Sequence, residues 1–369
     1  MEHHLKFHDG KFKIMQITDI QDAADVDAET LRLIEAALDK EKPGLAVLTG
    51  DQVKGYVRSM KNEENVERTI RQICAPFEAR GIPFTLAFGN HDIQGVSAEK
   101  QLAWYMESPM CAARDTPGLS GCGNHNLVIE GENGKPALNI YMLDSHGNAG
   151  LDGYQPLEAD QIEWYRETRE ALRGQAGDHV PSLLFQHIPV EAMYRLLIPH
   201  DKKAKGAIRG FAAFKDKYYS LDETKVRPGG RHLETLCVPG SDAGLFDAAR
   251  EKGELLGMYF GHDHKNSFAG PVDGIDLGYC PGCGLAAYGD GVHRGVRVFE
   301  FDEADPRAYR TRVVSYGDLF HRKSVSGLKH WLTDLTPGSV DDAVSKGIRL
   351  LLALGVIAGM IIALAILLS

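Results

Sequence analysis

Five stretches of this chain that are typical of buried strands each end in a cluster of polar side chains. The clearest is the apolar run 83–88, which ends at Gly89-Asn90-His91-Asp92. An amide, an imidazole and a carboxylate within three residues place a metal ligand, a proton donor and an orienting acid on one rim. A single match of four residues is more often an ordinary polar turn. Its meaning therefore depends on the other strand ends.

The other four runs end in metal-ligating side chains as well. In chain order these are Asp19 and Gln21 after 12–18, Asp51 after 45–49, His187 after 182–186, and His262 and His264 after 255–260. Helical patterns separate the first three runs, which predicts βαβ units and a largely parallel sheet. Ligands gather beyond the carboxyl ends of such strands, so the clusters are expected to meet. Gly261 permits the bend that turns His262 and His264 toward one point.

The later part of the chain indicates further strands. Short runs at 274–278, 296–301 and 309–314 have turn signals between them and predict a second, mostly antiparallel sheet packed on the first. The stretch 123–126 looks like a copy of the opening motif, but it lacks the final Asp and precedes a strand, so we interpret it as a turn. His146 follows another strand-like run and could approach the site, although a single loop histidine is more often solvated.

Composition limits the class of protein. Of the 369 residues, 43% are hydrophobic and 25% are charged, as in an ordinary soluble globular protein with a large core. The formal net charge of -10 argues against a nucleic-acid-binding protein, which usually presents a basic face. Six cysteines without a leader peptide favour a reducing compartment over a disulfide framework. The lone CxxC at 280–283 is more typical of a Pro-Gly turn than of a zinc or redox site.

The C-terminal stretch differs from the rest. Residues 350–368 carry no charge and are apolar on every face, and the stretch is close to the length of about 20 residues that crosses a bilayer. A buried core helix is usually shorter and amphipathic. Lys346 and Arg349 lie at its N-terminal side, which predicts a single-pass tail anchor in the cell membrane with the large domain on the cytoplasmic side. Gly355 and Gly359 could pack two such helices into a homodimer.

Taken together, the strand-end groups offer enough ligands for two metal ions. They are Asp19, Gln21, Asp51, Asn90, His91, His187, His262 and His264. Oxygen and imidazole donors without thiolate suit Mn, Fe or Zn and argue against a structural zinc site. A carboxylate such as Asp51 can bridge two ions held about 3.5–4 Å apart, which clamps a phosphoryl group. Independent turn or cap residues would explain any one cluster, but not all five.

This series of motifs resembles the calcineurin-like metallophosphoesterase superfamily over roughly 12–314. The motifs are Asp19-x-Gln21, Gly50-Asp51, Gly89-Asn90-His91-Asp92, His187 and Gly261-His262-Asp263-His264, and their order, spacing and strand context all match. The stretches 238–244 and 261–266 and the closing Arg294-Gly295-Val296-Arg297 are most similar to the Dcr2-like branch, which is related to purple acid phosphatases.

The resemblance implies a fold and a set of roles. The fold would be α/β, a four-layer α/β/β/α sandwich of two mixed sheets with two metals at the sheet edges. The ligands would be Asp19 and His264 for the first metal, Asp51 as the bridge, and Asn90, His187 and His262 for the second. His91 would protonate the leaving group or steady the phosphoryl oxygens, with Asp92 orienting its ring. A metal-bridging hydroxide would be the nucleophile.

Two positions depart from the pattern of the superfamily. Most members have Asp-x-His in the first motif, whereas this chain has Gln21, whose neutral amide oxygen is a harder donor than an imidazole nitrogen. Either Gln21 ligates weakly, or Asp22 or Asp25 replaces it, or the first metal is held loosely. Purple acid phosphatases also have a tyrosine ligand where this chain has Lys54, and Tyr56 lies two residues further on.

The segment 191–240 is inserted between two ligand-bearing strands and is basic in an acidic chain. Its ten basic residues are Arg195, Lys202, Lys203, Lys205, Arg209, Lys215, Lys217, Lys225, Arg227 and Arg231. It could be a lid that receives an anionic substrate, or a solvated surface excursion. We expect a catalytic domain at 1–321, a linker at 322–346 and a membrane anchor at 347–369.

The predicted function is that of a membrane-tethered phosphoesterase with two divalent or transition metal ions, acting on a phosphomonoester or phosphodiester. Its partners would be a phosphorylated small molecule or lipid and the membrane, and not nucleic acid. Two alternatives stay open. One is hydrolysis of a lipid-linked phosphate or pyrophosphate, which an anchor would favour by raising the local concentration. The other is a metal-bound scaffold that has lost turnover.

Overall fold

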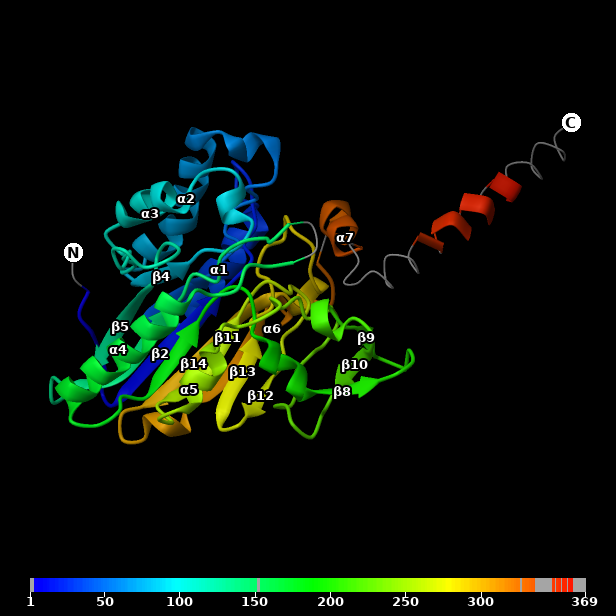
Figure 1. The fold of residues 1–369 in the computed structure, drawn as a ribbon. Coiled ribbons are helices and arrows are strands. Elements are labelled where there is room, and N and C mark those ends of the chain that lie inside the picture. Colours follow the sequence, from blue (N-terminus) through cyan, green and yellow to red (C-terminus); the bar gives the residue numbers. More distant parts are fainter. Residues whose placement is uncertain are drawn as a thin grey trace, which may run out of the picture.

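Two sheets packed face to face form the body of the protein (Figure 1). The computed structural model describes residues 3–150, 153–325 and 327–335, and short stretches at 347–348, 350–352, 354–356 and 358–360. The five-stranded sheet has the order β15-β14-β2-β3-β4. Its strands are β2 (Lys11–Ile17), β3 (Leu45–Thr49), β4 (Phe84–Ala87), β14 (Gly295–Asp302) and β15 (Arg310–Ser315).

The seven-stranded sheet has the order β1-β5-β6-β7-β11-β13-β12. Its strands are β1 (Leu5–Lys6), β5 (His125–Glu130), β6 (Pro136–Met142), β7 (Ser182–Phe185), β11 (Leu255–Phe260), β12 (Ala269–Val272) and β13 (Ile275–Tyr279). Both sheets contain parallel and antiparallel pairs, so both are mixed as expected.

Three hydrophobic clusters separate four layers. One lies between the five-stranded sheet and the helices α1 (Ala28–Glu41), α2 (Glu63–Glu78) and α3 (Ala98–Met106). A second lies between the two sheets. The third lies between the seven-stranded sheet and the helices α4 (Ala159–Ala176) and α5 (Leu245–Arg250). The result is a mixed α/β sandwich with helices outside and sheets inside.

Strand β2 shows how the sequence builds these layers. Successive side chains of a strand point to opposite faces of its sheet. Ile14 therefore lies in the cluster between the sheets, and Met15 lies in the cluster under the helices, and both are fully buried. A strand covered on both faces reads as an almost continuous apolar run, as the runs before the polar clusters do.

The prediction of a separate antiparallel sheet near the C-terminal end of the domain is wrong. The run 274–278 becomes β13, which pairs in parallel with β11 in the seven-stranded sheet. The runs 296–301 and 309–314 become β14 and β15, and β14 pairs with β2 in the five-stranded sheet. Strand β2 would otherwise be an unpaired edge. Its partner lies far along the chain, so local sequence patterns do not reveal the pairing.

The insertion 191–240 forms a small sheet of its own with the order β8-β10-β9. Its elements are the 3-10 turn η3 (Glu191–Leu196), β8 (Leu197–His200), β9 (Ile208–Arg209), the 3-10 turn η4 (Ala212–Phe214) and β10 (Tyr218–Leu221). It packs beside β12 in Figure 1. The chain then returns through α5 to β11.

The stretch after residue 315 contains two short helices. After α6 (Tyr316–Phe320), the stretch predicted as the linker 322–346 contains α7 (Leu328–Asp334), which forms an ion pair with Arg294 of the domain. Much of the predicted anchor 347–369, like 336–346, lies outside the described residues. Among the residues that are described, no helix has the length and apolar character needed to cross a bilayer.

His125 gives a prediction for the pH dependence of stability. Its ring is buried, with Nε2 2.6 Å from Thr85 Oγ1 and Nδ1 2.8 Å from the Gly123 carbonyl. Burial, with a smaller contribution from the charge of Arg114, lowers its pKa from 6.5 to about 4, although hydrogen bonds to the main chain of Gly123 and Arg114 act the other way. Below pH 6.5 the unfolded chain therefore takes up this proton first, and we expect stability to fall by up to about 3 kcal/mol as the pH drops toward 4.

The measurement is denaturant unfolding of the metal-free chain at several pH values, compared with His125→Gln. The glutamine variant does not titrate, so its free energy of unfolding should change less over this pH range. Parallel pH curves for the two proteins would show that His125 does not contribute to acid sensitivity.

Candidate metal centre

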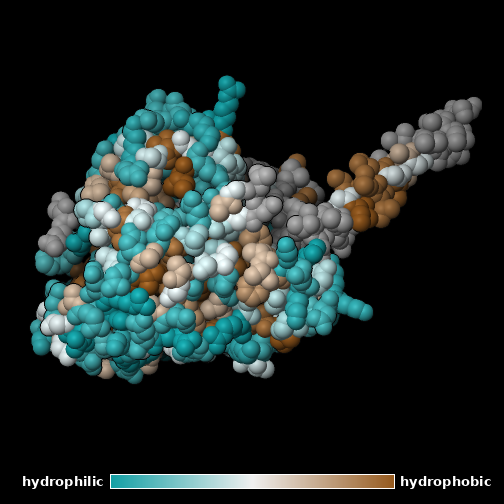
Figure 2. Space-filling model, in the orientation of Figure 1, coloured by the Kyte–Doolittle hydropathy of each residue, from teal (hydrophilic) through white to brown (hydrophobic). Residues whose placement is uncertain are grey.

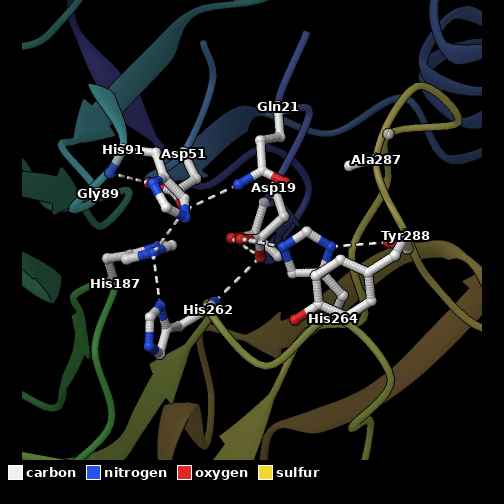
Figure 3. A network of polar contacts seen from close by, with 12 residues as sticks. Asp19, Gln21, Asp51, Gly89, His91, His187, His262, His264, Ala287 and Tyr288 are labelled. Carbon is white, nitrogen blue, oxygen red and sulfur yellow. Dashed lines mark hydrogen bonds and ion pairs between the residues drawn. The ribbon is translucent and has the colours of Figure 1, made fainter. Parts of the chain in front are cut away.

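The carboxyl ends of five strands bring the predicted ligands together at one edge of the sandwich (Figure 3). β2, β3 and β4 are parallel neighbours in one sheet, and β7 and β11 are parallel neighbours in the other. All eight strand-end residues meet in one network of contacts, which His91 joins through its main-chain N–H: Asp19, Gln21, Asp51, Asn90, His91, His187, His262 and His264.

His187 lies among the first group of donors. Its Nδ1 lies 2.9 Å from the carbonyl of Thr49, which can only accept, so Nδ1 carries a proton and the neutral ring has its lone pair on Nε2. That Nε2 lies 3.3 Å from Asp51 Oδ2, 3.2 Å from Asn90 Oδ1 and 3.2 Å from His262 Nδ1. Asp51, His187 and His262 thus each bring one ligand atom within 4.8 Å of the others in a buried site, and this group could hold a metal ion.

The electrostatics of this group favour positive charge. Burial lowers the pKa of the His187 imidazole, but the charge and hydrogen bond of Asp51, the charge of Asp19 and the Thr49 carbonyl together outweigh burial and raise the pKa to about 10. Burial likewise raises the pKa of Asp51, but the nearby imidazoles of His187, His91 and His262 together outweigh burial and hold the pKa of this carboxyl well below its usual range. A proton shared by these groups occupies the place that a metal ion would take.

Asp19 and His264 form the second group. The Nδ1 of His264 lies 2.8 Å from the Tyr288 carbonyl, so its Nε2 again has the lone pair, and this atom lies 3.2 Å from Asp19 Oδ1. The other oxygen of Asp19 accepts from the Thr18 hydroxyl at 2.8 Å and from the His262 main-chain N–H at 3.0 Å. Oδ1 is buried without a hydrogen-bond donor, as a metal-ligating oxygen is in the absence of its ion.

The donors therefore fit two metal ions. Asn90, His187 and His262 would hold one ion, Asp19 and His264 would hold the other, and Asp51 lies between the groups because its Oδ2 is close to both His187 and Gln21. When bound, the two ions would polarise a phosphoryl oxygen and lower the pKa of a water molecule.

The backbone at the ligands is strained in a way typical of functional sites. Asp19, Gln21, Asp51 and His262 have positive φ angles of 52°, 40°, 54° and 73°. A non-glycine residue rarely adopts such a conformation without a functional reason. Gly89 adds to this geometry, because a Cβ there would lie 2.2 Å from Asp51 Oδ1. The glycine lets the Asn90 and Asp51 loops approach each other.

His91 lies beside the donors without joining them. Its Nε2 is 4.0 Å from Asp51 Oδ2, and its Nδ1 is 3.0 Å from Gln94 Oε1. The ring is about 30% exposed and faces the cavity, so it can reach a substrate. Tyr56 packs edge-on against it, with ring centroids 4.7 Å apart. Gln94 and Tyr56 therefore set the orientation of this imidazole.

The expectation that Asp92 orients the ring of His91 is wrong. Asp92 starts a 3-10 turn, and its carboxylate turns back to accept the main-chain N–H groups of Asp51, Gly89 and Val53, each at 2.8 Å. It therefore fixes the loop that carries Asp51. The carboxylate accepts three backbone N–H groups and therefore does not contact His91, and a motif of four residues does not reveal these partners. Gln94 lies beside the His91 ring instead.

Neither carboxylate proposed as a substitute for Gln21 reaches the centre. Both oxygens of Asp22 accept main-chain N–H groups, those of Ala23 and Asp27 at 2.8 Å each. The side chain of Asp25 is 87% exposed. The amide of Gln21 points inward instead, with its nitrogen placed 3.4 Å from Asp51 Oδ2. Because amide oxygen and nitrogen can exchange places by a flip, Gln21 is positioned to offer its oxygen to an ion.

Gln21 gives a second prediction. We expect Gln21→His to bind the ion at the Asp19–His264 group more tightly, by on the order of tenfold, because an imidazole is the stronger donor for transition metals. Gln21→Ala should weaken the same ion. Chelator competition with purified chain measures both affinities. Equal affinity in all three proteins would show that residue 21 does not take part in metal binding.

The position of the tyrosine ligand of purple acid phosphatases is filled by a different residue in this chain. Lys54 occupies its position, and the Lys54 ammonium donates to the Ala286 carbonyl at 2.6 Å. Tyr56 packs on His91 instead.

The donors open into a cavity of about 270 Å³. Sequence patterns missed several of its lining residues, which are Asn148, Gly153, Tyr154, Phe211, Glu234, Cys237 and Tyr288. Asn148 accepts from Asn90 Nδ2 at 3.1 Å and so turns the Asn90 oxygen toward His187. Tyr154 packs edge-on against His262 with ring centroids 4.6 Å apart. These residues come from loops without a recognisable motif.

Two weaker expectations can be compared with this cavity. The insertion 191–240 reaches it through Phe211, Glu234 and Cys237, but none of the ten basic side chains is among the described residues that line it. Several of them pair with acids elsewhere, such as Arg195 with Asp273. The lining thus gives no support to a basic lid. His146 also lies outside the lining, with its Nε2 2.8 Å from Gln161 Oε1.

Buried carboxylate, amide and imidazole donors at the edge of two facing sheets define the class of metal-dependent phosphoesterases. Comparison with known proteins agrees. The sequence profile described as calcineurin-like phosphoesterase matches residues 12–266. The chain belongs to this family, and it is a metal-dependent phosphoric ester hydrolase. Its two groups of donors would fit two metal ions.

Individual relatives indicate the branch of the family to which this chain is similar. "Probable inactive purple acid phosphatase 14" of Arabidopsis thaliana is 30% identical over 337 residues, which cover 80% of this chain and 77% of that protein. "Phosphatase DCR2" of Saccharomyces cerevisiae is 27% identical over 335 residues, covering 80% and 52%. A dimetal phosphatase from Danio rerio has the same fold, with a TM-score of 0.52 at 14% identity over 83% of this chain and 99% of that one. The relatives confirm the similarity to the Dcr2-like and purple acid phosphatase branch.

Proposed function

We propose that this protein is a membrane-tethered phosphoesterase that hydrolyses a phosphomonoester or phosphodiester at two bound metal ions of the Mn, Fe or Zn type. The observation that carries the proposal is the convergence of lone pairs on the two groups of donors. Asp51 Oδ2, Asn90 Oδ1 and His262 Nδ1 all face His187 Nε2. Asp19 Oδ1 faces His264 Nε2 without a donor.

The chain's own residues supply orientation and a proton. His91 is the one imidazole of the network whose ring avoids the donor groups, so it is available to protonate the departing oxygen of the ester. The lining offers no Lys or Arg among the described residues, so a phosphoryl group here would be held by the ions and by His91. Tyr154 and Phe211, with ring centroids 5.7 Å apart, provide an apolar wall for the rest of the substrate.

The tethering part of the proposal rests on the C-terminal stretch. The described residues within 347–360 are helical, and their large apolar side chains are exposed, from 53% for Ile348 to 70% for Leu351. Figure 2 shows them as an apolar surface beyond the domain. A Cβ at Gly355 or Gly359 would meet nothing within 4 Å, which leaves both free to pack on a second copy.

The test uses the full chain in detergent, stripped of metal and then reloaded with Mn²⁺, Fe²⁺ or Zn²⁺. We expect hydrolysis of chromogenic phosphomonoesters or phosphodiesters to return with metal, and the stripped protein to be inactive. If metal binds but hydrolysis of every ester tested stays absent, the phosphoesterase proposal is refuted and the metal-bound scaffold is favoured. Flotation with vesicles tests the tether, because a tethered chain should rise with the vesicles. The double variant Leu352→Arg, Val356→Arg is the control, and we expect it to remain in the fraction that does not float.

Hydrolysis of a lipid-linked phosphate or pyrophosphate is the second candidate, and the exposed apolar stretch is the observation that favours it. Comparing a lipid phosphate in vesicles with its water-soluble head group would separate the two. A strong preference for the lipid would replace the first proposal by the second. The scaffold alternative draws on Gln21 and on the word "inactive" in the names of the Arabidopsis relatives.

A further inference from the structure

A segment that is not itself part of the ligand set forms hydrogen bonds with the loops that carry Asp19 and His264. This segment is 282–288, which we call the clasp, and it begins inside the CxxC at 280–283. Three of its main-chain N–H groups donate at 3.0 Å to carbonyls of the ligand loops: Gly282 to His264, Cys283 to Thr18, and Gly284 to Asp19. The clasp thus holds the backbone of both residues of the second donor group.

The other end of the clasp holds side chains. The Tyr288 carbonyl accepts from His264 Nδ1 at 2.8 Å, and the Tyr288 ring stacks on the His264 ring with centroids 4.1 Å apart and planes 5° apart (Figure 3). The Ala286 carbonyl accepts from Lys54, three residues after Asp51. The position of the clasp therefore sets the tautomer and the direction of His264.

Arg294 holds the clasp in place. It is fully buried, and its guanidinium donates from Nε to the Gly284 carbonyl at 2.9 Å and from one terminal nitrogen to the Ala287 carbonyl at 2.6 Å. Gly289 lets it approach, since a Cβ there would lie 2.6 Å from the guanidinium carbon. The proposed catalytic roles do not explain the closing Arg-Gly-Val-Arg motif. Its first arginine, Arg294, binds the backbone carbonyls of the clasp.

The charge of Arg294 is balanced from α7. Its other terminal nitrogen pairs with Asp334, at the end of α7, and among the described residues this is the one carboxylate in an ion pair with Arg294. Removal of this carboxylate would leave the buried guanidinium as an uncompensated charge, which destabilises the folded arrangement around it. The same helix contacts the domain again through His330, 3.2 Å from Asp27. Asp27 in turn donates its main-chain N–H to Asp22, next to Gln21.

We propose that Asp334 and Arg294 are a positioning pair for the metal centre: by docking α7, they hold the clasp and through it keep Asp19 and His264 in the geometry that binds one of the two ions. The inference rests on the metal centre of the proposed function. It does not depend on the substrate or on turnover. It makes α7, which the sequence places in a linker, a working part of the catalytic domain.

The experiment is a Mn²⁺ titration of the metal-stripped full chain by chelator competition, together with the thermal unfolding temperature of the metal-free protein. We expect Asp334→Asn to weaken one ion by on the order of tenfold while the other ion binds as in the wild type. Asp334→Glu, which restores the carboxylate, should recover most of the affinity.

Asp273→Asn is the matched control. Asp273 pairs with Arg195 and Arg250 at the surface, its side chain is 34% exposed against 23% for Asp334, and it lies in the β12–β13 turn. We expect it to lower the unfolding temperature without changing either Mn²⁺ affinity. If Asp334→Asn behaves like this control, the pair is merely structural and the inference is wrong. A wild-type chain that binds no Mn²⁺ would overturn the metal centre itself, and the inference with it.

Discussion

Asp51→Asn should lower kcat by about 10³-fold or more and leave the chain with fewer than two bound ions. Among the residues that the structure describes, Asp51 is the carboxylate placed between the two donor groups, 3.3 Å from His187 Nε2 on one side and 3.4 Å from the Gln21 amide on the other. Asparagine keeps the shape but removes the negative charge that holds two cations close together. Elemental analysis of metal per chain and hydrolysis of a chromogenic ester measure the two effects.

Asp178→Asn is the control for this prediction. Asp178 is an exposed carboxylate just before β7, at the end of that strand opposite to His187. It should leave metal content and kcat unchanged. An Asp51→Asn variant that keeps two ions and near-normal activity would contradict the role of Asp51 between the ions and would require another group to join them.

His91→Ala should lower kcat by about 10²- to 10⁴-fold while both ions stay bound. Its ring lies at the cavity and contacts Gln94 and Tyr56, but no donor of the two groups lies within hydrogen-bond distance of its Nε2. If His91 protonates the leaving oxygen, the loss depends on the ester. An alkyl ester needs the proton and should lose the full factor, whereas an aryl ester with an acidic phenol should lose much less.

Gln94→Ala serves as the comparison for His91. It removes the side chain that orients the His91 ring but keeps the ring, so it should lower kcat on the same alkyl ester less than His91→Ala does. Equal losses of His91→Ala on alkyl and aryl esters would mean that the imidazole steadies the phosphoryl oxygens rather than supplying a proton. Loss of an ion from His91→Ala would instead make His91 a ligand.

The parts of the fold that were predictable have local causes. The runs that became β3 and β11 were located to the residue, because a strand buried on both faces must be apolar throughout and must end where the polar loop begins. The pairing of β14 with β2 was missed, because hydrogen bonds between strands carry no local sequence signal. The same holds for Asn148 and Tyr288, which reach the centre from loops that share no motif with the ligands.

The sequence by itself determined which candidate metal ligands converge, since short metal-ligating clusters at the ends of parallel strands meet wherever the strands share an edge. Only the tertiary structure decided how those residues are used. Asp92 serves backbone N–H groups instead of His91, and Asp334 reaches Arg294 from a stretch that was predicted to be a linker. The physical reason is that each buried donor or acceptor must find a partner in space, and its partner is chosen by packing between segments that are distant in the chain.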